Sequence, residues 1–155
     1  MELTATADTT APPERVWELL ADPTTYADWW VEWHSAKTDD MPLEVGSAVT
    51  MRRIDHDPEK GGVNEVRDFH NYRMPVTECD PGRRLAIQNR SIGTEDFVFT
   101  IEPIGSGSRI TYERRAKVPR LMKLLGKAMQ GRLERQVEES VTGLAQLAEG
   151  GAPPG

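Results

Sequence analysis

The side chains best suited to acid–base chemistry in this sequence are His70 and Asp68, two positions apart in a run that reads as a β-strand. Because side chains alternate across a strand, the two share one face. A histidine next to a carboxylate can act as a general base, since the carboxylate supports its charged form. An arginine on the same side, Arg53 or Arg114, would hold the enolate or carboxylate that forms when a proton is removed beside a carbonyl. We therefore predict a catalytic set of His70, Asp68 and Arg114; the alternative is that His70 is a half-buried strand residue at the edge of the sheet.

These residues must be positioned by strands that precede one long helix. The chain reads as a strand over Leu3–Thr9, two short helices, about five antiparallel strands between Val45 and Val118, and a helix over Pro119–Glu149. Apolar residues in the last segment recur every three or four positions, which is typical of an amphipathic helix with one face against a core. We predict an α+β fold in which a curved antiparallel sheet of about six strands wraps around this helix.

The alternation along the strands also predicts which side chains face the helix. The inward set is apolar at the strand ends and polar between them, with Arg53, Asp68, His70, Asn89, Tyr112 and Arg114 as its polar members. Buried polar groups are unfavourable unless they are paired, so this set needs internal partners or a polar ligand. A bulge near Pro75 would reverse the faces of the residues before it.

A ligand between sheet and helix would contact aromatic, polar and flexible apolar side chains. The predicted ligand-binding residues are Trp29, Trp30, Trp33, Met51, Arg53, Tyr72, Asn89, Phe97, Phe99, Tyr112, Leu121, Met122, Leu125 and Met129. The tryptophans either stack on a flat ligand or pack the second short helix onto the sheet. The methionines fit an adaptable cavity wall or an ordinary core. Gly126 and Gly131 weaken the long helix, and a close approach of ligand or sheet would explain them.

The composition favours one globular domain over residues 1–149, followed by a disordered tail at 150–155. The formal net charge of −6 argues against a nucleic-acid partner, because phosphate binding needs a basic surface. No apolar run is long enough to span a membrane and the N-terminus has no secretory signal, so we expect a cytoplasmic protein. The sequence has one cysteine, no phosphate-binding glycine loop and no close pair of histidines, so we expect no cofactor and no metal site.

Three stretches and the terminal helix resemble the SRPBCC (START-like) superfamily, and most closely its polyketide cyclase/dehydrase-like branch. The stretches are Ala11–Pro23 (APPERVWELLADP) followed by the tryptophans, Val45–Ser47 (VGS), and Val76–Leu85 (VTECDPGRRL). The resemblance covers nearly the whole chain, and it implies the helix-grip fold with a deep apolar cavity between sheet and helix. The superfamily includes aromatic-polyketide cyclases, lipid and quinone carriers, hormone-binding proteins and chaperone activators, so the resemblance alone assigns no reaction.

Together these features predict a protein that binds a hydrophobic, aromatic or polyketide-like small molecule in an internal cavity. In the enzymatic version, His70, Asp68 and an arginine catalyse cyclisation or dehydration by cofactor-free acid–base chemistry. In the alternative version the protein carries a lipid, quinone or pigment unchanged. A third version is a chaperone-type interaction protein that uses its outer face. The sequence leaves open whether the protein is a monomer or a homodimer.

Overall fold

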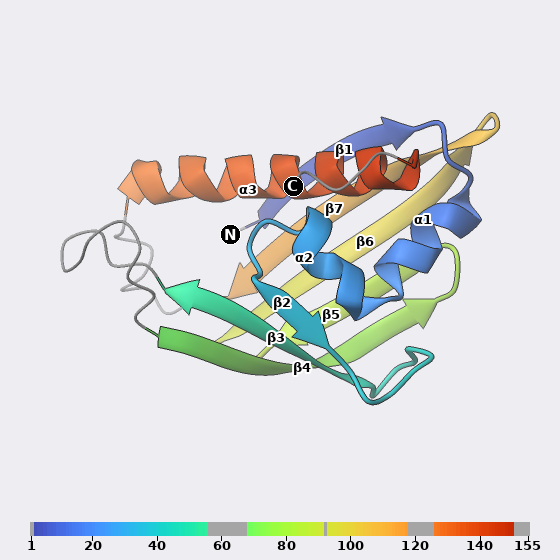
Figure 1. Cartoon of the computed structure of the whole chain (residues 1–155). Coiled ribbons are helices and arrows are strands. Elements are labelled where there is room, and N and C mark those ends of the chain that lie inside the picture. The colour runs from blue at the N-terminus through green and yellow to red at the C-terminus, as the bar shows by residue number, and fades with distance from the viewer. Residues whose placement is uncertain (1, 56–67, 92, 118–125, 151–155) are drawn as a thin grey trace.

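The computed structural model describes residues 2–55, 68–91, 93–117 and 126–150, and it shows one curved antiparallel sheet with three helices on its concave face (Figure 1). For 54–55, 68–70 and 126–129 the description covers the backbone only. In chain order the elements are β1 (Glu2–Thr9), α1 (Pro13–Leu20), the 3₁₀ turn η1 (Pro23–Thr25), α2 (Tyr26–Trp29), β2 (Ser35–Lys37), β3 (Ala48–Asp55), β4 (Asp68–Asp80), β5 (Arg84–Asn89), β6 (Thr94–Ile104), β7 (Gly107–Lys117) and α3 (Gly126–Ala148).

The strands lie in the order β1-β7-β6-β5-β4-β3-β2, with every neighbouring pair antiparallel. The long helix α3 crosses the concave face beside β1, as the red and dark-blue elements of Figure 1 show. The predicted α+β helix-grip architecture is therefore confirmed. The described residues form seven strands where about six were expected. The additional strand is β2, in a segment to which the sequence analysis assigned no strand, and it pairs with β3 through Ala36 and Met51.

The core lies between the inner face of the sheet and the second half of α3. Val137, Val141 and Leu144 are buried at helical spacing, whereas Leu133 is only half-buried. Burial of this stripe against the sheet is what keeps α3 helical, since isolated helices are marginal in water. The predicted start of this helix, near Pro119, lies outside the described residues.

The close approach on α3 occurs at Gly143. A Cβ at this position would lie 3.0 Å from the backbone oxygen of Trp29, so glycine lets α3 approach α2. At Gly131 no described part of the sheet comes within 4 Å of such a Cβ, and the nearest atom is Nη1 of Arg135 at 3.8 Å. The expectation of a close sheet contact at Gly131 is wrong for the described structure. The surroundings of Gly126 are not described.

The interruption near Pro75 is a bulge that follows it. The register of β4 on β5 shifts between Val76 and Glu78, so that Val76 pairs with Ile87 and Cys79 pairs with Leu85. Because the shift comes after Val76, the residues on its N-terminal side keep the alternation of faces that the sequence predicts. Met74 and Val76 are both buried, at 0% and 1% exposure. No helix in the described ranges is long and apolar enough to cross a membrane.

Candidate functional site

Aromatic rings fill the concave face beneath α2. Trp30 stacks on Trp29 with ring centroids 5.3 Å apart. Trp30 also makes T-shaped contacts with Phe97, Phe99 and Tyr112, at centroid distances of 5.5, 5.1 and 5.8 Å. All five rings are at most 2% exposed. Such T-shaped and stacked pairs add stability beyond the burial of area. The tryptophans of α2 therefore pack this short helix onto β6 and β7, which is one of the two predicted interpretations; their role as ligand contacts stays a prediction.

A buried polar network extends from these rings. Trp30 Nε1 donates to Tyr112 Oη at 3.1 Å, and Tyr112 Oη donates to Glu32 Oε1 at 3.2 Å. Arg114 donates twice to Glu95, from Nε at 2.9 Å and from Nη2 at 3.1 Å, in the parallel fork that makes arginine–carboxylate pairs strong. Its third nitrogen, Nη1, lies 3.1 Å from Glu32 Oε2. These five residues are called the Glu32 network below.

Three buried polar atoms on this face have no hydrogen-bond partner among the described residues: Glu32 Oε2, Arg114 Nη1 and Trp33 Nε1. Arg114 Nη1 and Glu32 Oε2 are close enough for an ion pair, but the angle between them does not fit a hydrogen bond. Buried polar groups without a partner are uncommon, and each one raises the free energy of the folded protein. One acceptor and two donors are thus available in an otherwise aromatic interior.

The burial of this network controls its charges. Burial raises the pKa of the Glu32 carboxyl. The charge of Glu95 adds to this rise, whereas the charge of Arg114, the Tyr112 hydrogen bond and the charge of Arg53 oppose it. Burial also raises the pKa of the Tyr112 hydroxyl, so that group stays protonated. For Arg114, burial alone would lower the pKa, but the charges of Glu32 and Glu95 outweigh it and raise the pKa. Arg114 is therefore a permanent cation between two carboxyls, and burial favours the protonated form of Glu32.

A second cation, Arg53 of β3, lies against the aromatic rings at the other side of Trp33. Its guanidinium carbon is 4.9 Å from the ring centroid of Trp33 and 5.7 Å from that of Tyr72. Trp33 also meets Phe97 at 6.0 Å, and the guanidinium of Arg114 lies 5.4 Å from the same Phe97 ring. The two arginines consequently flank one aromatic surface, and cation–π contacts stabilise both.

A family model described as "Polyketide cyclase / dehydrase and lipid transport" matches residues 1–149. The chain belongs to this family. The match and the observed fold agree with the SRPBCC resemblance of the sequence. No curated protein matches the chain in sequence.

Solved structures share the fold of this polyketide cyclase/dehydrase family member at low identity. A protein of Chromobacterium violaceum is 21% identical with a TM-score of 0.68, covering 96% of this chain and 97% of that one. A protein of Thermus thermophilus is 18% identical with a TM-score of 0.71, covering 96% and 97%. DynU16, described as a putative protein in the dynemicin biosynthetic locus, is 19% identical with a TM-score of 0.66, covering 98% of this chain and 48% of that one. At such identities the similarity shows the fold alone.

The structure of this family member brings most of the predicted site residues together on the concave face. Those with described side chains there are Trp29, Trp30, Trp33, Met51, Arg53, Tyr72, Phe97, Phe99, Tyr112 and Arg114. Asn89 is half-buried, and its side-chain oxygen accepts from the backbone of Ser91 in a local turn. Leu121, Met122 and Leu125 lie outside the described residues, as does the side chain of Met129.

The predicted catalytic set is only partly visible. The backbones of His70 and Asp68 lie in β4, where His70 pairs with Arg53 and Asp68 with Asp55, but their side chains are not described. Arg114 uses Nε and Nη2 for Glu95, and Nη1 is its nitrogen without a hydrogen-bond partner among the described residues. The assignment of these three residues to catalysis stays a prediction.

Two members of the Glu32 network were missed by the sequence analysis. Glu95 continues the alternation of Phe97 and Phe99, so its inward position could have been inferred from parity. Glu32 follows α2 in an irregular segment where no period predicts a direction. The one available signal was a single charge inside the aromatic run Trp30–Trp33.

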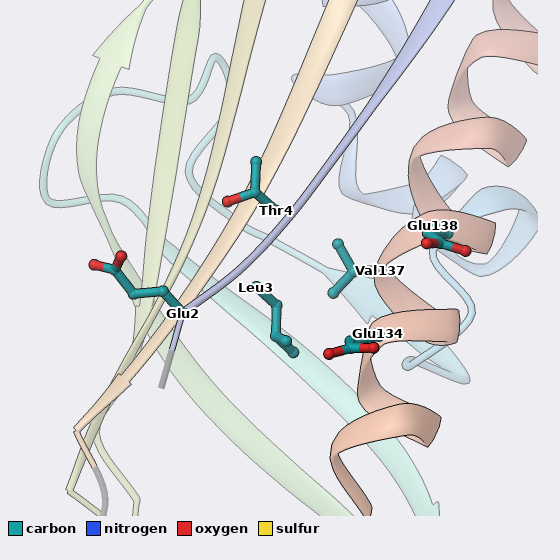
Figure 2. A pocket seen from close by; sticks show the side chains of 6 residues that line it. All are labelled: Glu2, Leu3, Thr4, Glu134, Val137 and Glu138. Atoms are coloured by element: carbon teal, nitrogen blue, oxygen red, sulfur yellow. The ribbon is translucent and has the colours of Figure 1, made fainter. Parts of the chain in front are cut away.

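A separate hollow, with a volume of about 190 Å³, lies between the start of β1 and α3. Figure 2 shows the side chains that line it. Leu3 and Val137 lie in the gap, and Glu2, Glu134 and Glu138 surround it together with Thr4. In the part of the chain that the structure describes, no group of three His, Cys, Asp or Glu side chains is arranged to hold a metal ion. We therefore assign no ligand to this hollow.

Proposed function

We propose that this protein binds a hydrophobic, aromatic or polyketide-like small molecule between the concave face of the sheet and α3, with a polar end of the ligand against Glu32, Arg114 and Trp33. The observation that supports this most directly is the set of three buried polar atoms without partners among the described residues. Because native interiors leave few such atoms unsatisfied, these are the atoms that a ligand would be expected to satisfy.

The chemistry of these atoms indicates what kind of polar group fits. Arg114 Nη1 and Trp33 Nε1 are donors, so they suit an oxygen of the ligand. The rings of Phe97, Trp33 and Tyr72 surround the same region and suit a flat apolar body. An aromatic molecule with an oxygen substituent satisfies both requirements.

The enzymatic version of this function adds acid–base chemistry to the binding. Residues paired across antiparallel strands have Cβ atoms about 5 Å apart, and this places the backbone of His70 beside Arg53. His70 with Asp68 would then remove a proton while an arginine holds the resulting anion, which leads to cyclisation or dehydration without a cofactor. The carrier version needs binding only. The family description includes both enzymatic and transport functions.

Binding is tested by following tryptophan fluorescence while 2-naphthol and naphthalene are titrated into the protein, alongside native mass spectrometry of the protein as purified. We expect saturable one-to-one binding, with 2-naphthol held more tightly than naphthalene. Trp33→Phe should weaken 2-naphthol roughly fivefold, because one hydrogen bond is worth about 1 kcal/mol, and should leave naphthalene unchanged. Trp17→Phe, on the far helix α1, is the matched control and should change neither affinity. If neither compound binds saturably, the result contradicts the proposal.

The enzymatic version needs its own test. His70→Ala should retain ligand binding and lose turnover of any substrate that the wild type converts. Equal turnover in the variant and the wild type would leave only the carrier version.

A further inference from the structure

We propose that Glu32 exchanges a proton with the bound ligand through Oε2, while Arg114, Glu95 and Tyr112 act as positioning residues; this inference rests on the proposed ligand site. Glu32 lies in the loop after α2, and its side chain is 2% exposed. A carboxyl this deeply buried is normally satisfied at both oxygens. Among the described residues only Oε1 is satisfied, by the Tyr112 hydroxyl.

The charges around Glu32 indicate that one proton belongs to the network. Arg114 is a single cation between two carboxyls, and its fork is directed at Glu95 rather than at Glu32. The groups that face Glu32 are Tyr112 and Arg114 from β7, Glu95 from β6 and, at longer range, Arg53 from β3. Two carboxylates beside one guanidinium, with Glu32 buried and Glu95 half-buried, are less stable than one carboxylate and one carboxylic acid. Glu32, with the poorer alignment, is the carboxyl that gains or loses the proton.

The position of Oε2 beside a cationic donor defines the step. When Glu32 is ionised, Oε2 accepts the proton of a ligand hydroxyl, phenolic or enolic, while the ligand oxygen accepts from Arg114 Nη1. If the proton moves fully, the O–H bond of the ligand breaks, an O–H bond forms on Glu32, and the negative charge passes to the ligand oxygen beside Arg114. The reverse transfer restores both groups, so the step needs no other reactant.

This mechanism distinguishes a hydroxyl from its methyl ether. A hydroxyl binds best to ionised Glu32, because a charge-assisted hydrogen bond is stronger than a neutral one. A methyl ether has no hydroxyl proton, so it forms a hydrogen bond with Glu32 only when Glu32 is protonated and donates to the ether oxygen. The two ligands should therefore respond to pH with opposite signs, since deprotonation of Glu32 helps one and hinders the other.

The experiment measures the affinities of 2-naphthol and 2-methoxynaphthalene between about pH 4.5 and about pH 8, where a phenolic hydroxyl with a pKa near 10 stays protonated. In the wild type, 2-naphthol should bind about tenfold more tightly at the upper end, and 2-methoxynaphthalene about fivefold more weakly. Glu32→Gln should remove both trends. Glu102→Gln, an exposed glutamate on β6, is the matched control and should keep both.

Two further variants keep the test decisive if Glu32→Gln folds poorly. Glu32→Asp retains the carboxyl and should restore both trends. Tyr112→Phe removes the donor to Oε1 and should move the midpoint of both trends to higher pH, because that hydrogen bond lowers the pKa of Glu32. An unchanged midpoint in Tyr112→Phe, or the same two trends in Glu32→Gln and the wild type, overturns the role of Glu32 but leaves the binding site standing. If neither compound binds the wild type, the proposed function fails, and this inference with it.

Discussion

Glu32 is the residue whose protonation most directly links the interior of this protein to pH. The folded state holds its proton more tightly than the unfolded chain does, because burial raises the pKa of the carboxyl above its ordinary value of 4.5. Hydrogen bonding by Tyr112 and the charge of Arg114 reduce this rise without removing it. Stability should therefore depend on pH through this one side chain, even in the absence of a ligand.

The sign of this dependence follows from proton binding. The stability that the Glu32 proton contributes is complete below the ordinary pKa of 4.5 and is lost as the pH rises through the higher folded pKa. We expect Glu32→Gln to gain stability relative to the wild type as the pH rises above the ordinary pKa of 4.5, as measured by urea unfolding at several pH values. A difference between the two proteins that does not change with pH would show that Glu32 has the same pKa in both states.

At the scale of elements, the helices are fixed on the sheet by a few close contacts. Gly143 lets α3 approach Trp29, and Thr9 Oγ1 donates to the backbone oxygen of Ala145 at 2.9 Å, which connects β1 to the same helix. The backbone N–H of Val31 donates to the Ser140 hydroxyl at 3.2 Å. These contacts determine where the segment that carries Glu32 lies relative to the sheet.

Two glycines of α3, Gly131 and Gly143, should respond oppositely to alanine. Gly143→Ala would place a Cβ 3.0 Å from the Trp29 oxygen, and overpacking of this kind costs about 1–3 kcal/mol, more than the roughly 1 kcal/mol that alanine gains in a helix. Gly131→Ala meets no such obstacle among the described residues and should stabilise the protein by up to about 1 kcal/mol. Urea unfolding of both variants tests this. Equal stabilisation by the two substitutions would mean that α2 shifts to accommodate the new methyl group at no cost in stability.

The sequence predicts those elements that carry a clear period, and fails where no period exists. Alternation placed Tyr112 and Arg114 on the inner face, and both are buried. The three-residue strand β2 is too short to show alternation, so no strand was predicted there. Glu32 was missed for the same reason, because the direction of a loop side chain depends on tertiary contacts that no local pattern encodes.

At the scale of the whole molecule, Arg114 joins segments that are distant in the sequence. It lies on β7, pairs with Glu95 on β6 and reaches Glu32 after α2. Its removal would leave two carboxyls with no cation in the fork, one of them fully buried. Breaking a buried ion pair is far more destabilising than losing an exposed one.

Arg114→Met should therefore lower the free energy of unfolding by about 3 kcal/mol near neutral pH, and by less in acid, where the carboxyls are protonated. Arg115→Met is the matched control, since Arg115 is an exposed neighbour that pairs with Glu113, and it should change stability by less than about 1 kcal/mol. The measurement is urea unfolding of both variants at the two pH values. Similar losses in the two variants would contradict a special role for the buried pair.

The Glu32 network also favours the native pairing of the strands over a shifted one. A slip of β7 by two residues would keep every apolar side chain on the inner face, because the period of a strand is two. The hydrophobic pattern alone therefore does not distinguish the native register from this alternative. Such a slip would carry Tyr112 and Arg114 together away from Glu32, leaving a buried carboxyl with neither its donor nor its cation. The charged residues thus exclude a misaligned sheet that apolar burial would tolerate.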